Sequence, residues 1–506
     1  MVYLLAVGPI RDRGYEETGD TNNEVERQST GTMPIRDEYG LYIDGEWQPR
    51  DNQFDVLDPA TNQPLVSVAD ATASDAELAI QSAGNAFEEW SAVDPAQRGR
   101  VLSAIADELR DHHGELAQIE SMETGRPIAQ SRGRITGGIG FFDYFAGLAD
   151  KIEGETIPID GKRHSFTIRE PLGVTGHIVP WNSPTVLACR SFAPALACGN
   201  TVVAKPSLEA PLTVMHIAEI ATKAGLPAGA LNVVPDSDAA AGKAITESET
   251  VRGISFTGSR SAGKQVMKTA AETLTPVDLE LGGNTPCLVF PDADIDDVVE
   301  DTIASYDNAG QICFTISRFF VHRDVYDVFT AAFVEAIEAL EIGPWQEEPD
   351  IGPVISRASV DRLDTYVTEA VENGARLLAG GETPRERGNF YAPTLLDNVE
   401  DTAPIVCDEL FGPVKTLHQF DTEAEVIRRA NDTDYGLYAS IWTDDVGRVH
   451  RLIDAMEAGV VVVNEFPILA PQTPFGGYKE SGIGRTKGKQ AIHNFTQVKN
   501  ATISYE

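Results

Sequence analysis

Apolar residues recur every three or four positions in two stretches of the first quarter of the chain, Asp75–Trp90 and Arg98–Glu123. This spacing predicts amphipathic helices. Ahead of them, Tyr42–Trp47 reads Tyr-Ile-Asp-Gly-Glu-Trp, and an Asp-Gly pair between short apolar runs predicts a β-hairpin. Residues 8–35 are polar and rich in turn residues. We therefore expect residues 1–35 to form a loosely ordered tail.

Residues 152–171 follow a strand pattern with one mostly polar face, and Asp160-Gly161 lies between its two halves. A long hairpin of this kind has little core of its own and is stable only when it packs against something else. We expect it to contact a second copy of the chain and to pair with the strand-like segment Gln497–Tyr505.

From Gly173 onward, short apolar runs alternate with helical patterns. The predicted strands are 173–179, 201–204, 231–234 and 253–256, and the predicted helices are 184–196, 211–224 and 262–272. A second series of strands and helices runs from Pro286 to about Val463. Such alternation predicts an α/β fold with parallel sheets. Because no linker or repeat interrupts residues 36–506, we expect two interleaved domains.

Charge is the unusual feature of the composition. The 506 residues include 78 acids and 40 Lys or Arg, of which only 12 are Lys, and the net charge is −38. This charge repels phosphate backbones and anionic membranes, so we expect neither nucleic acid nor membrane as a partner. The acids are spread along the chain. They favour a halophilic, solvating surface over an acidic tail that binds a basic partner.

The five cysteines exclude some classes of protein. They show no C-x-x-C pair and are too sparse for a disulfide framework or a zinc ribbon. We expect no metal site. The apolar run Tyr3–Val7 is short and has no basic segment before it, so it does not resemble a signal peptide. A reducing, cytoplasmic location fits best.

Six short motifs with chemical potential occur in order along the chain. They are PWNSP from Pro180, FTGSRSAG from Phe256, LELGGN from Leu279, NAGQIC from Asn308, ELFGPV from Glu409 and PFGGYK from Pro474. Each is weak alone, but together, across residues 38–500, they resemble the aldehyde dehydrogenase superfamily of the hydrolytic, NAD(P)-dependent type.

The resemblance implies a Rossmann-like cofactor-binding domain interleaved with an α/β catalytic domain, plus a β-ribbon oligomerisation element. The implied boundaries are 36–151 with 172–282 for the NAD(P)-binding domain, 283–484 for the catalytic domain, and 152–171 with 485–506 for the oligomerisation element. A homodimer or homotetramer is the implied assembly.

Cys313 is the implied nucleophile. An isolated cysteine is most often a small buried hydrophobe. Here the residues before it are polar and include Gly310, so backbone N–H groups are available to a thiolate. An attacking thiolate needs a lowered pKa and partial exposure.

Glu280 and Asn182 are the other implied catalytic residues. A carboxylate at the end of an apolar strand is costly unless it is paired, functional or turned to solvent. The resemblance makes Glu280 the general base that activates water against a thioester, and burial would raise its pKa toward the working range. Asn182, otherwise a turn asparagine, would hold an oxyanion together with the N–H of Cys313. The sequence between Glu280 and Cys313 is one residue shorter than in the family. We expect the missing residue to fall in the helix at 295–307 or at its end.

The cofactor implied by the resemblance is NAD(P)+. Gly258 and Gly263 open a predicted helix after a predicted strand, an arrangement that favours a pyrophosphate. By resemblance Ser259 contacts that pyrophosphate, Lys205 holds the adenosine ribose, and Glu409, with Phe411 beside it, holds the nicotinamide ribose. Two further cofactor contacts are assigned to Trp181 and Leu281.

One position departs from the family pattern. NAD-preferring relatives often carry a glutamate three residues after the lysine, but here Leu208 occupies that position and Glu209 follows it. If the segment is helical, Glu209 points about 100° away and misses the ribose. Loss of the carboxylate removes repulsion against a 2′-phosphate, so both NAD and NADP remain open.

The substrate is a small-molecule aldehyde whose identity the sequence leaves open. The resemblance places Arg190, Phe314, Leu469 and Phe475, with Ser183, near the substrate tunnel. Arg190 could pair with the carboxylate of a semialdehyde, or form a surface or intersubunit salt bridge. Relatives acting on aromatic aldehydes also carry an arginine here.

The predicted reaction oxidises an aldehyde to the carboxylic acid through a cysteine thiohemiacetal and thioester. A CoA-acylating semialdehyde dehydrogenase is the nearest alternative, but Glu280 argues against it because hydrolysis would compete. A non-catalytic binding relative would be expected to lose Cys313 or Glu280, and both are present. An acidic partner-binding protein is suggested only by the charge.

Overall fold

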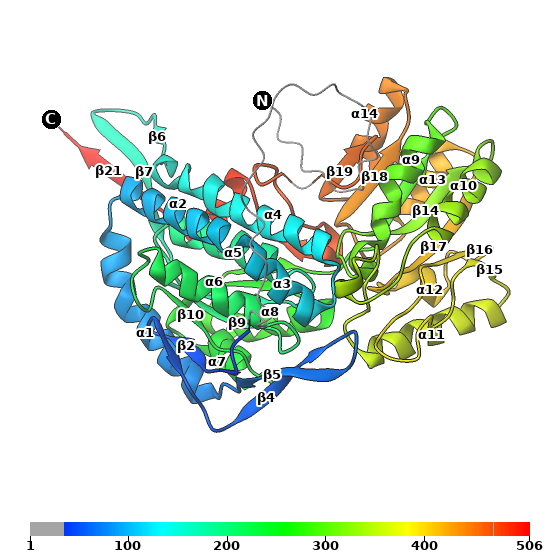
Figure 1. Ribbon diagram of the computed structural model, residues 1–506. Helices are drawn as coiled ribbons and strands as arrows, with labels where there is room; N and C mark the ends of the chain where they lie inside the picture. Colours follow the sequence, from blue (N-terminus) through cyan, green and yellow to red (C-terminus); the bar gives the residue numbers. More distant parts are fainter. Residues whose placement is uncertain (1–34, 469, 506) are drawn as a thin grey trace, which may run out of the picture.

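The computed structural model describes residues 35–468 and 470–505. Two large sheets with covering helices lie side by side, one in the blue-to-green half of the chain and one in the yellow-to-orange half (Figure 1). This confirms the α/β expectation. Residues 1–34 of the expected tail and Leu469 lie outside the described residues.

The first sheet has eight strands. In spatial order they are β20 (Gly482–Ile483), β12 (Val277–Glu280), β11 (Val251–Thr257), β8 (Val174–Val179), β9 (Thr201–Pro206), β10 (Leu231–Val233), β2 (Leu41–Ile43) and β3 (Glu46–Gln48). The five central strands are parallel. Chain order reverses between β8 and β11, and ligands bind beyond the carboxyl ends of strands at such a switch point.

Helices cover both faces of this sheet. They are α1 (Ala73–Ala92), α2 (Pro95–Asp111), α3 (His113–Thr124), α4 (Ile128–Ala146), α5 (Pro184–Ala197), α6 (Leu212–Lys223), α7 (Ala240–Glu247) and α8 (Arg260–Thr273), with a 3₁₀ turn at Ala149–Lys151. Along β9, Val202 and Ala204 join the core beneath α2–α6, whereas Val203 joins the core with α7 and α8. Burial on both faces explains the continuous apolar runs of the parallel strands.

Two helical regions of this domain differ from the sequence-based prediction. The helical region 98–123 is two helices that meet at His112. Helix α4 was not anticipated, because its four glycines are poor helix formers. One of them, Gly138, permits close packing on α5: a Cβ there would lie 2.8 Å from the Thr185 methyl carbon.

The second sheet has seven strands, all parallel except the edge strand β15. In spatial order they are β15 (Arg376–Ala379), β16 (Thr394–Asp397), β17 (Val414–Phe420), β14 (Ile316–His322), β13 (Thr285–Val289), β18 (Tyr438–Trp442) and β19 (Val460–Val463). Its helices are α9 (Ile295–Thr302), α10 (Tyr326–Glu338), α11 (Arg357–Glu372), α12 (Pro404–Cys407), α13 (Glu423–Asn431) and α14 (Val446–Ala455). Shorter 3₁₀ segments are Ile303–Gly310, Trp345–Glu347, Lys479–Ser481 and Lys489–Phe495.

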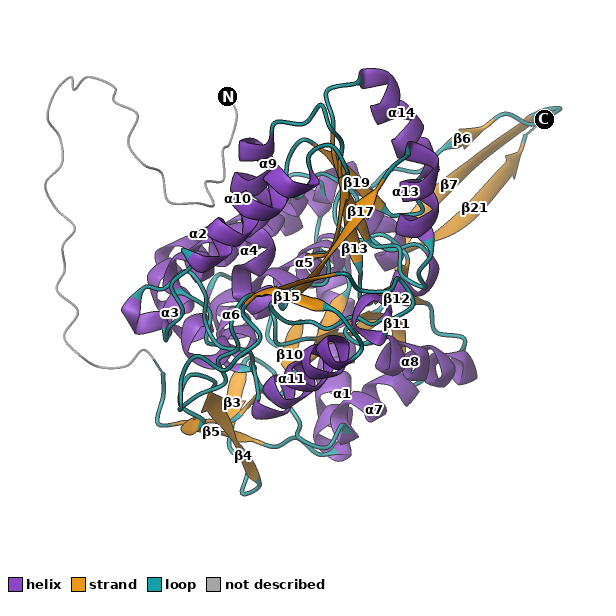
Figure 2. Cartoon of the chain, turned by 90° about the vertical axis from the view of Figure 1, so that its right-hand side faces the viewer, coloured by secondary structure: helices purple, strands orange, loops and turns teal. Residues whose placement is uncertain are grey.

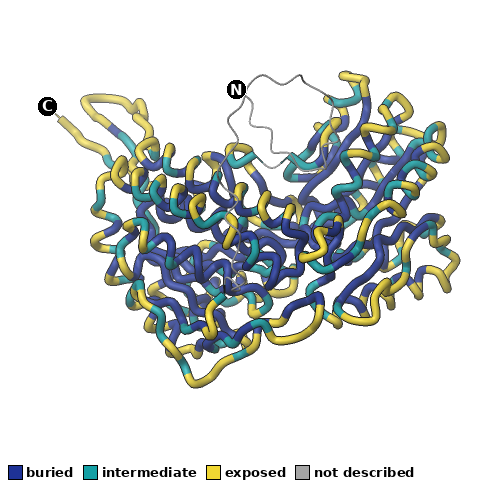
Figure 3. The backbone as a smooth tube through the Cα atoms, in the orientation of Figure 1, coloured by how far each residue is buried: buried dark blue, intermediate teal, exposed yellow. Residues whose placement is uncertain are grey.

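A three-stranded ribbon projects from one corner of the molecule (Figures 1 and 2). It consists of β6 (Thr156–Ile157), β7 (Arg163–Pro171) and β21 (Thr496–Ser504). β21 pairs antiparallel with the whole of β7, which confirms the expected pairing. Figure 3 shows the ribbon largely exposed, in contrast to the buried strands of the two sheets. Its outward apolar side chains include Val498 and Ile503, which are more than half exposed.

A second hairpin, β4 (Gln53–Asp58) with β5 (Gln63–Ala69), pairs with β1 (Glu38–Tyr39) at the opposite side of the molecule (Figure 1). In the described part of the chain, every helix is too short or too polar to span a membrane.

Candidate active site

The segment that leaves the first sheet and enters the second carries the candidate base. Glu280 ends β12, and Thr285 begins β13 after four intervening residues. Gly283, between them, packs on the backbone of Cys313, since a Cβ there would lie 2.1 Å from the Cys313 carbonyl oxygen. The candidate base and nucleophile are therefore brought together where the carboxyl end of one sheet meets the amino end of the other.

Cys313 lies between a tight turn and β14. In that turn Asn308, Ala309 and Gly310 all have positive φ (51°, 52° and 68°), a strained conformation that is common at functional sites. The Cys313 side chain is half-buried. The expectation of a lowered thiol pKa is wrong for this structure. Burial raises the pKa to about 12, Arg190 opposes the rise, and the carboxyl groups of Glu280 and Glu409 add to it. In this structure the thiol is therefore protonated, and it must lose its proton before the sulfur can attack.

Glu280 is buried, so the alternative of a solvent-facing glutamate is excluded. Oε1 accepts a hydrogen bond from the Thr486 hydroxyl at 3.2 Å, and Oε2 accepts none from the described residues. Burial raises the pKa to about 8, with Arg190 opposing and Asp278 reinforcing the shift. The expected rise is confirmed, and it leaves a carboxyl group able to exchange protons near neutral pH.

Asn182 is also buried, just beyond the carboxyl end of β8. Its side-chain amide donates to the carbonyl oxygen of Gln311 at 2.9 Å, and its own carbonyl accepts from the side-chain amide of Asn308 at 3.1 Å. These bonds tie the candidate oxyanion donor to the turn that precedes Cys313.

A buried ion pair that the sequence reading missed supports this arrangement. Arg126 and Glu120 form a 2.9 Å pair, and both side chains are fully buried. Arg126 also donates to the Asn182 carbonyl, to the Ser183 hydroxyl at 2.9 Å and to the Asn308 side chain at 3.2 Å. The signal in the sequence was a glutamate beside apolar Ile119 within a helix, where a charge is costly unless paired.

The glycine motif lies at the switch point of the first sheet. Gly258 follows β11, and the Ser259 hydroxyl caps α8 by accepting from the backbone N–H of Ala262 at 3.3 Å. Gly263 packs on Leu281, because a Cβ there would lie 2.5 Å from a Leu281 methyl carbon. The first backbone N–H groups of a helix can donate hydrogen bonds to a pyrophosphate. Glycines there have no side chain to keep the pyrophosphate away from the backbone.

Two of the remaining cofactor candidates, Lys205 and Trp181, lie at the carboxyl ends of β9 and β8, in the same sheet as β11. Lys205, in β9, forms a 2.8 Å ion pair with buried Asp236. Glu409 accepts from the backbone N–H of Gly283 at 3.0 Å, and burial raises its pKa to about 7. The rings of Trp181 and Phe411 meet edge to face, with centroids 5.5 Å apart. The residues present therefore fit a dinucleotide. The backbone N–H groups at the start of α8 can bind its phosphates, and the Glu409 carboxyl group lies near Cys313.

Residues 207–210 form a turn and not a helix, so the angular argument for Glu209 does not apply. The Glu209 carboxylate instead accepts from the Ser207 hydroxyl. The side chain of Leu208 is partly exposed.

The substrate candidates form an aromatic cluster. The ring centroids of Phe314 and Phe475 lie 6.1 Å apart, and Tyr438 and Phe466 also pack on Phe314. Arg190 is buried, its Cζ lies 5.5 Å from the Phe475 centroid, and it donates to the Thr257 hydroxyl at 3.2 Å. A surface salt bridge at Arg190 is therefore excluded. The Ser183 hydroxyl accepts a hydrogen bond from Arg126, and Leu469 lies outside the described residues.

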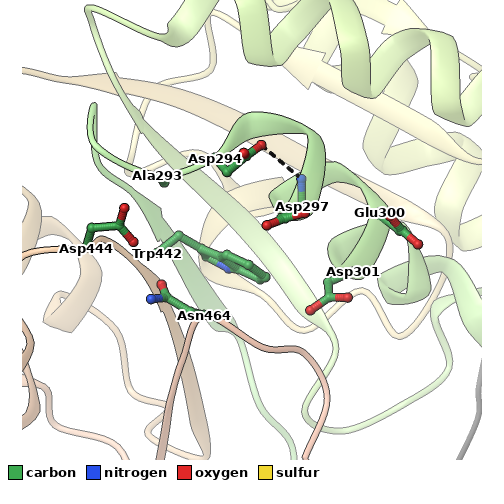
Figure 4. Close-up of a pocket in the computed structure, with 8 residues that line it drawn as sticks. All are labelled: Ala293, Asp294, Asp297, Glu300, Asp301, Trp442, Asp444 and Asn464. Carbon is green, nitrogen blue, oxygen red and sulfur yellow. Dashed lines mark hydrogen bonds between the residues drawn. The ribbon is translucent and has the colours of Figure 1, made fainter.

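A separate pocket of about 410 Å³ opens between α9 and the ends of β18 and β19 (Figure 4). Its lining includes five carboxylates and none of the candidate site residues; they are Asp294, Asp297, Glu300, Asp301 and Asp444. The candidate active site therefore lies outside this pocket.

Comparisons with known proteins agree with the geometry. Residues 47–501 match the description "Aldehyde dehydrogenase family". The chain is 40% identical over 473 residues to DhaS of Bacillus subtilis, covering 92% of this chain and 96% of that protein. It is 37% identical to the hydroxyisobutyraldehyde dehydrogenase of Mycolicibacterium austroafricanum, covering 94% and 95%.

Solved structures give the same result. An aldehyde dehydrogenase from Bacillus cereus, in complex with NAD+, superposes with a TM-score of 0.92 at 35% identity, covering 96% of this chain and all of that one. An NADP-dependent enzyme from E. coli superposes with a TM-score of 0.91 at 37% identity, covering 92% and 98%. The chain therefore belongs to the aldehyde dehydrogenase family and is an NAD(P)-dependent aldehyde dehydrogenase.

Proposed function

We propose that this enzyme oxidises an aldehyde to the free carboxylic acid, with Cys313 as nucleophile and Glu280 as general base. The observation that carries the proposal is the buried Glu280 carboxyl group, with one oxygen that accepts no bond from the described residues, on the segment that packs against Cys313.

The residues act in sequence. The Cys313 thiol loses its proton to solvent, and its sulfur attacks the aldehyde carbon. The Asn182 amide with the N–H of Cys313 holds the resulting oxyanion. When bound, NAD(P)+ supplies the acceptor for hydride, which converts the thiohemiacetal to a thioester. Glu280 then takes a proton from water as the water oxygen adds to the acyl carbon. The C–S bond breaks, the acid leaves, and the sulfur regains a proton.

The test is an aldehyde panel with NAD and NADP, with and without coenzyme A, in which reduced cofactor and acid are both measured. Formation of free acid at a rate independent of coenzyme A supports the hydrolytic reaction. Acyl-CoA as the main product would establish the acylating alternative, and no reduced cofactor with any aldehyde would favour a non-catalytic relative.

We further propose that residues 36–151 and 172–282 form the cofactor-binding domain, 283–484 the catalytic domain, and 152–171 with 485–506 the oligomerisation element. In this proposal the ribbon of β6, β7 and β21 joins subunits into a dimer or tetramer. Its exposed apolar side chains support this role, because a solitary ribbon has little core. We also propose a cytoplasmic location and an adaptation to high salt. The adaptation is proposed because the net charge is −38.

A further inference from the structure

Asp236 is a buried carboxylate beside the residue assigned to the adenosine ribose. It follows β10, the parallel neighbour of β9, and the backbone N–H of Val234 donates to the carbonyl oxygen of Ala204 at 2.9 Å. This register brings Asp236 to the carboxyl end of β9, where its Oδ1 atom lies 2.8 Å from Nζ of Lys205. The Asp236 side chain is fully buried, whereas that of Lys205 is 15% exposed. The lysine therefore reaches solvent on one side of the pair, and the carboxylate does not.

The start of α7 holds this pair in place. Oδ2 of Asp236 accepts a hydrogen bond from the backbone N–H of Gly242 at 3.1 Å. Gly242 also packs on the stem of the lysine, because a Cβ there would lie 3.8 Å from Cδ of Lys205. A fully buried carboxylate is costly unless it is paired and hydrogen-bonded, and both conditions are met here. The pair is therefore a built part of the fold and not a chance surface contact.

The chain around the pair is acidic. The two segments that flank it, residues 206–210 and 235–249, contain four more carboxylates: Glu209, Asp238, Glu247 and Glu249. The one cation of these segments, Lys243, lies 3.6 Å from Glu247. The positive charge of Lys205 is thus already balanced by Asp236, and the flanking segments supply no second unpaired cation for a further anion.

We propose that Asp236 makes this enzyme prefer NAD over NADP, by holding the Lys205 ammonium and cancelling its charge. An ammonium group carries three N–H donors, so Lys205 can donate to the hydroxyls of an adenosine ribose while it remains paired. A 2′-phosphate brings a charge of about −1.5 to −2 near neutral pH, and it would lie near a paired lysine instead of a free cation. Because Leu208 carries no charge, NADP stays usable, but as the poorer cofactor.

Asp236 is a positioning residue in this inference, because it acts through Lys205. The inference rests on the assignment of Lys205 to the ribose, and it goes beyond the proposed oxidation by choosing between two cofactors. The competing role of the pair is purely structural, as a tie between β9 and the segment after β10. A structural tie supports NAD and NADP binding equally, whereas a carboxylate that cancels the lysine charge changes the ratio of their affinities.

The experiment measures the binding of NAD and of NADP to the full-length enzyme by calorimetry, without aldehyde, and then kcat/KM for each cofactor. The salt is about 1 M KCl, where the Debye length is about 3 Å and buried pairs are screened much less than exposed charges. Asp236→Asn removes the charge and keeps the shape, and Glu249→Gln is the matched control at an exposed position. Lys205→Met and the double variant complete the set. The double variant leaves no unpaired charge in the site.

We expect the unmodified enzyme to bind NAD at least about tenfold more tightly than NADP. Asp236→Asn should reduce that ratio at least about tenfold, mainly through tighter NADP binding, because a unit charge is removed close to the phosphate. Glu249→Gln should leave the ratio unchanged. Lys205→Met should weaken NAD binding and raise the ratio. The double variant should return to the ratio of the unmodified enzyme, so the Asp236 charge is tested in two backgrounds even if one single variant does not fold.

An unchanged ratio after removal of the Asp236 charge, or an equal loss of affinity for both cofactors, would overturn the inference and leave the pair as a structural tie. Unchanged NAD binding in Lys205→Met would overturn the ribose assignment on which it rests. An enzyme that binds cofactor with the expected ratios but oxidises no aldehyde of the panel would instead count against the proposed function.

Discussion

Thr486 donates a hydrogen bond to Oε1 of Glu280 at 3.2 Å, and this bond stabilises the charged form of the carboxyl group. Asp278 acts in the opposite sense. It lies two residues before Glu280 on β12, buried on the same strand face, and its charge raises the pKa of Glu280. The base is thus set between a neighbour that favours its ionised form and one that disfavours it.

These two neighbours predict opposite shifts of the pH profile. Glu280 accepts a proton only when ionised, so the deacylation rate should rise with pH through its pKa of about 8. Asp278→Asn removes a negative charge, lowers that pKa and moves the rise to lower pH. Thr486→Val removes the hydrogen bond and moves it to higher pH. The measurement is kcat against pH where deacylation limits turnover. Exposed Asp51→Asn is the control for charge, and shifts of the same sign in the two test variants would contradict the arrangement.

Gly283 predicts a severe effect from a single methyl group. A Cβ would lie 2.1 Å from the Cys313 carbonyl oxygen, so Gly283→Ala must displace the backbone of the nucleophile. A misplacement of about 1 Å costs about 100-fold in rate, and we expect at least that loss in kcat/KM together with a lower Tm.

Gly133→Ala is the matched control for this substitution. It lies within α4, and a Cβ there would meet no described atom within 4 Å beyond the neighbouring backbone of the same helix. It should keep activity and stabilise the protein by up to about 1 kcal/mol. Normal activity in Gly283→Ala would show that the close approach does not position Cys313.

Cofactor preference should depend on Leu208. Because no carboxylate stands three residues after Lys205, we predict measurable NADP use. Leu208→Glu should raise the ratio of kcat/KM for NAD to that for NADP, through repulsion of the 2′-phosphate. Leu208→Gln, of the same shape without the charge, should change the ratio little. Strict NAD specificity of the unmodified enzyme would show that another residue sets the choice.

The sequence was sufficient for the features that depend on local pattern. Apolar runs such as β9 are continuous because both faces are buried, so the alternation of strands and helices could be read directly. The turn residues at Asp160-Gly161 marked the ribbon, and the order of the motifs identified the family.

Features that depend on packing between distant segments could not be read this way. Of the four glycines in helix α4, Gly138 lies against α5, and this packing outweighs its low helix propensity. The pKa of Cys313 is raised by burial and by Glu280 and Glu409, which reach the thiol only after the two sheets meet. Lys487 follows no periodic pattern: its own backbone has a φ of 62°, and its Nζ atom lies 5.2 Å from the centroid of Phe475.

The net charge of −38 predicts a requirement for salt. At about 0.01 M the Debye length is on the order of 30 Å, and at about 1 M it is about 3 Å, so self-repulsion is strongest in dilute buffer. Subunit contacts between equally acidic copies should weaken first. Sizing and activity across a KCl series should therefore show both an oligomer and activity that increase toward molar salt. Full activity and an unchanged oligomer in dilute buffer would mean that the acidic surface is only tolerated.

The most direct measurement is the time course of reduced-cofactor formation after rapid mixing of aldehyde with Glu280→Gln and with Cys313→Ala. Because oxidation precedes deacylation, Glu280→Gln should release a burst of about one equivalent per active site and then turn over slowly. Cys313→Ala should give no burst and no turnover. Normal steady-state turnover by Glu280→Gln, or a burst from Cys313→Ala, would contradict the assignment of nucleophile and base.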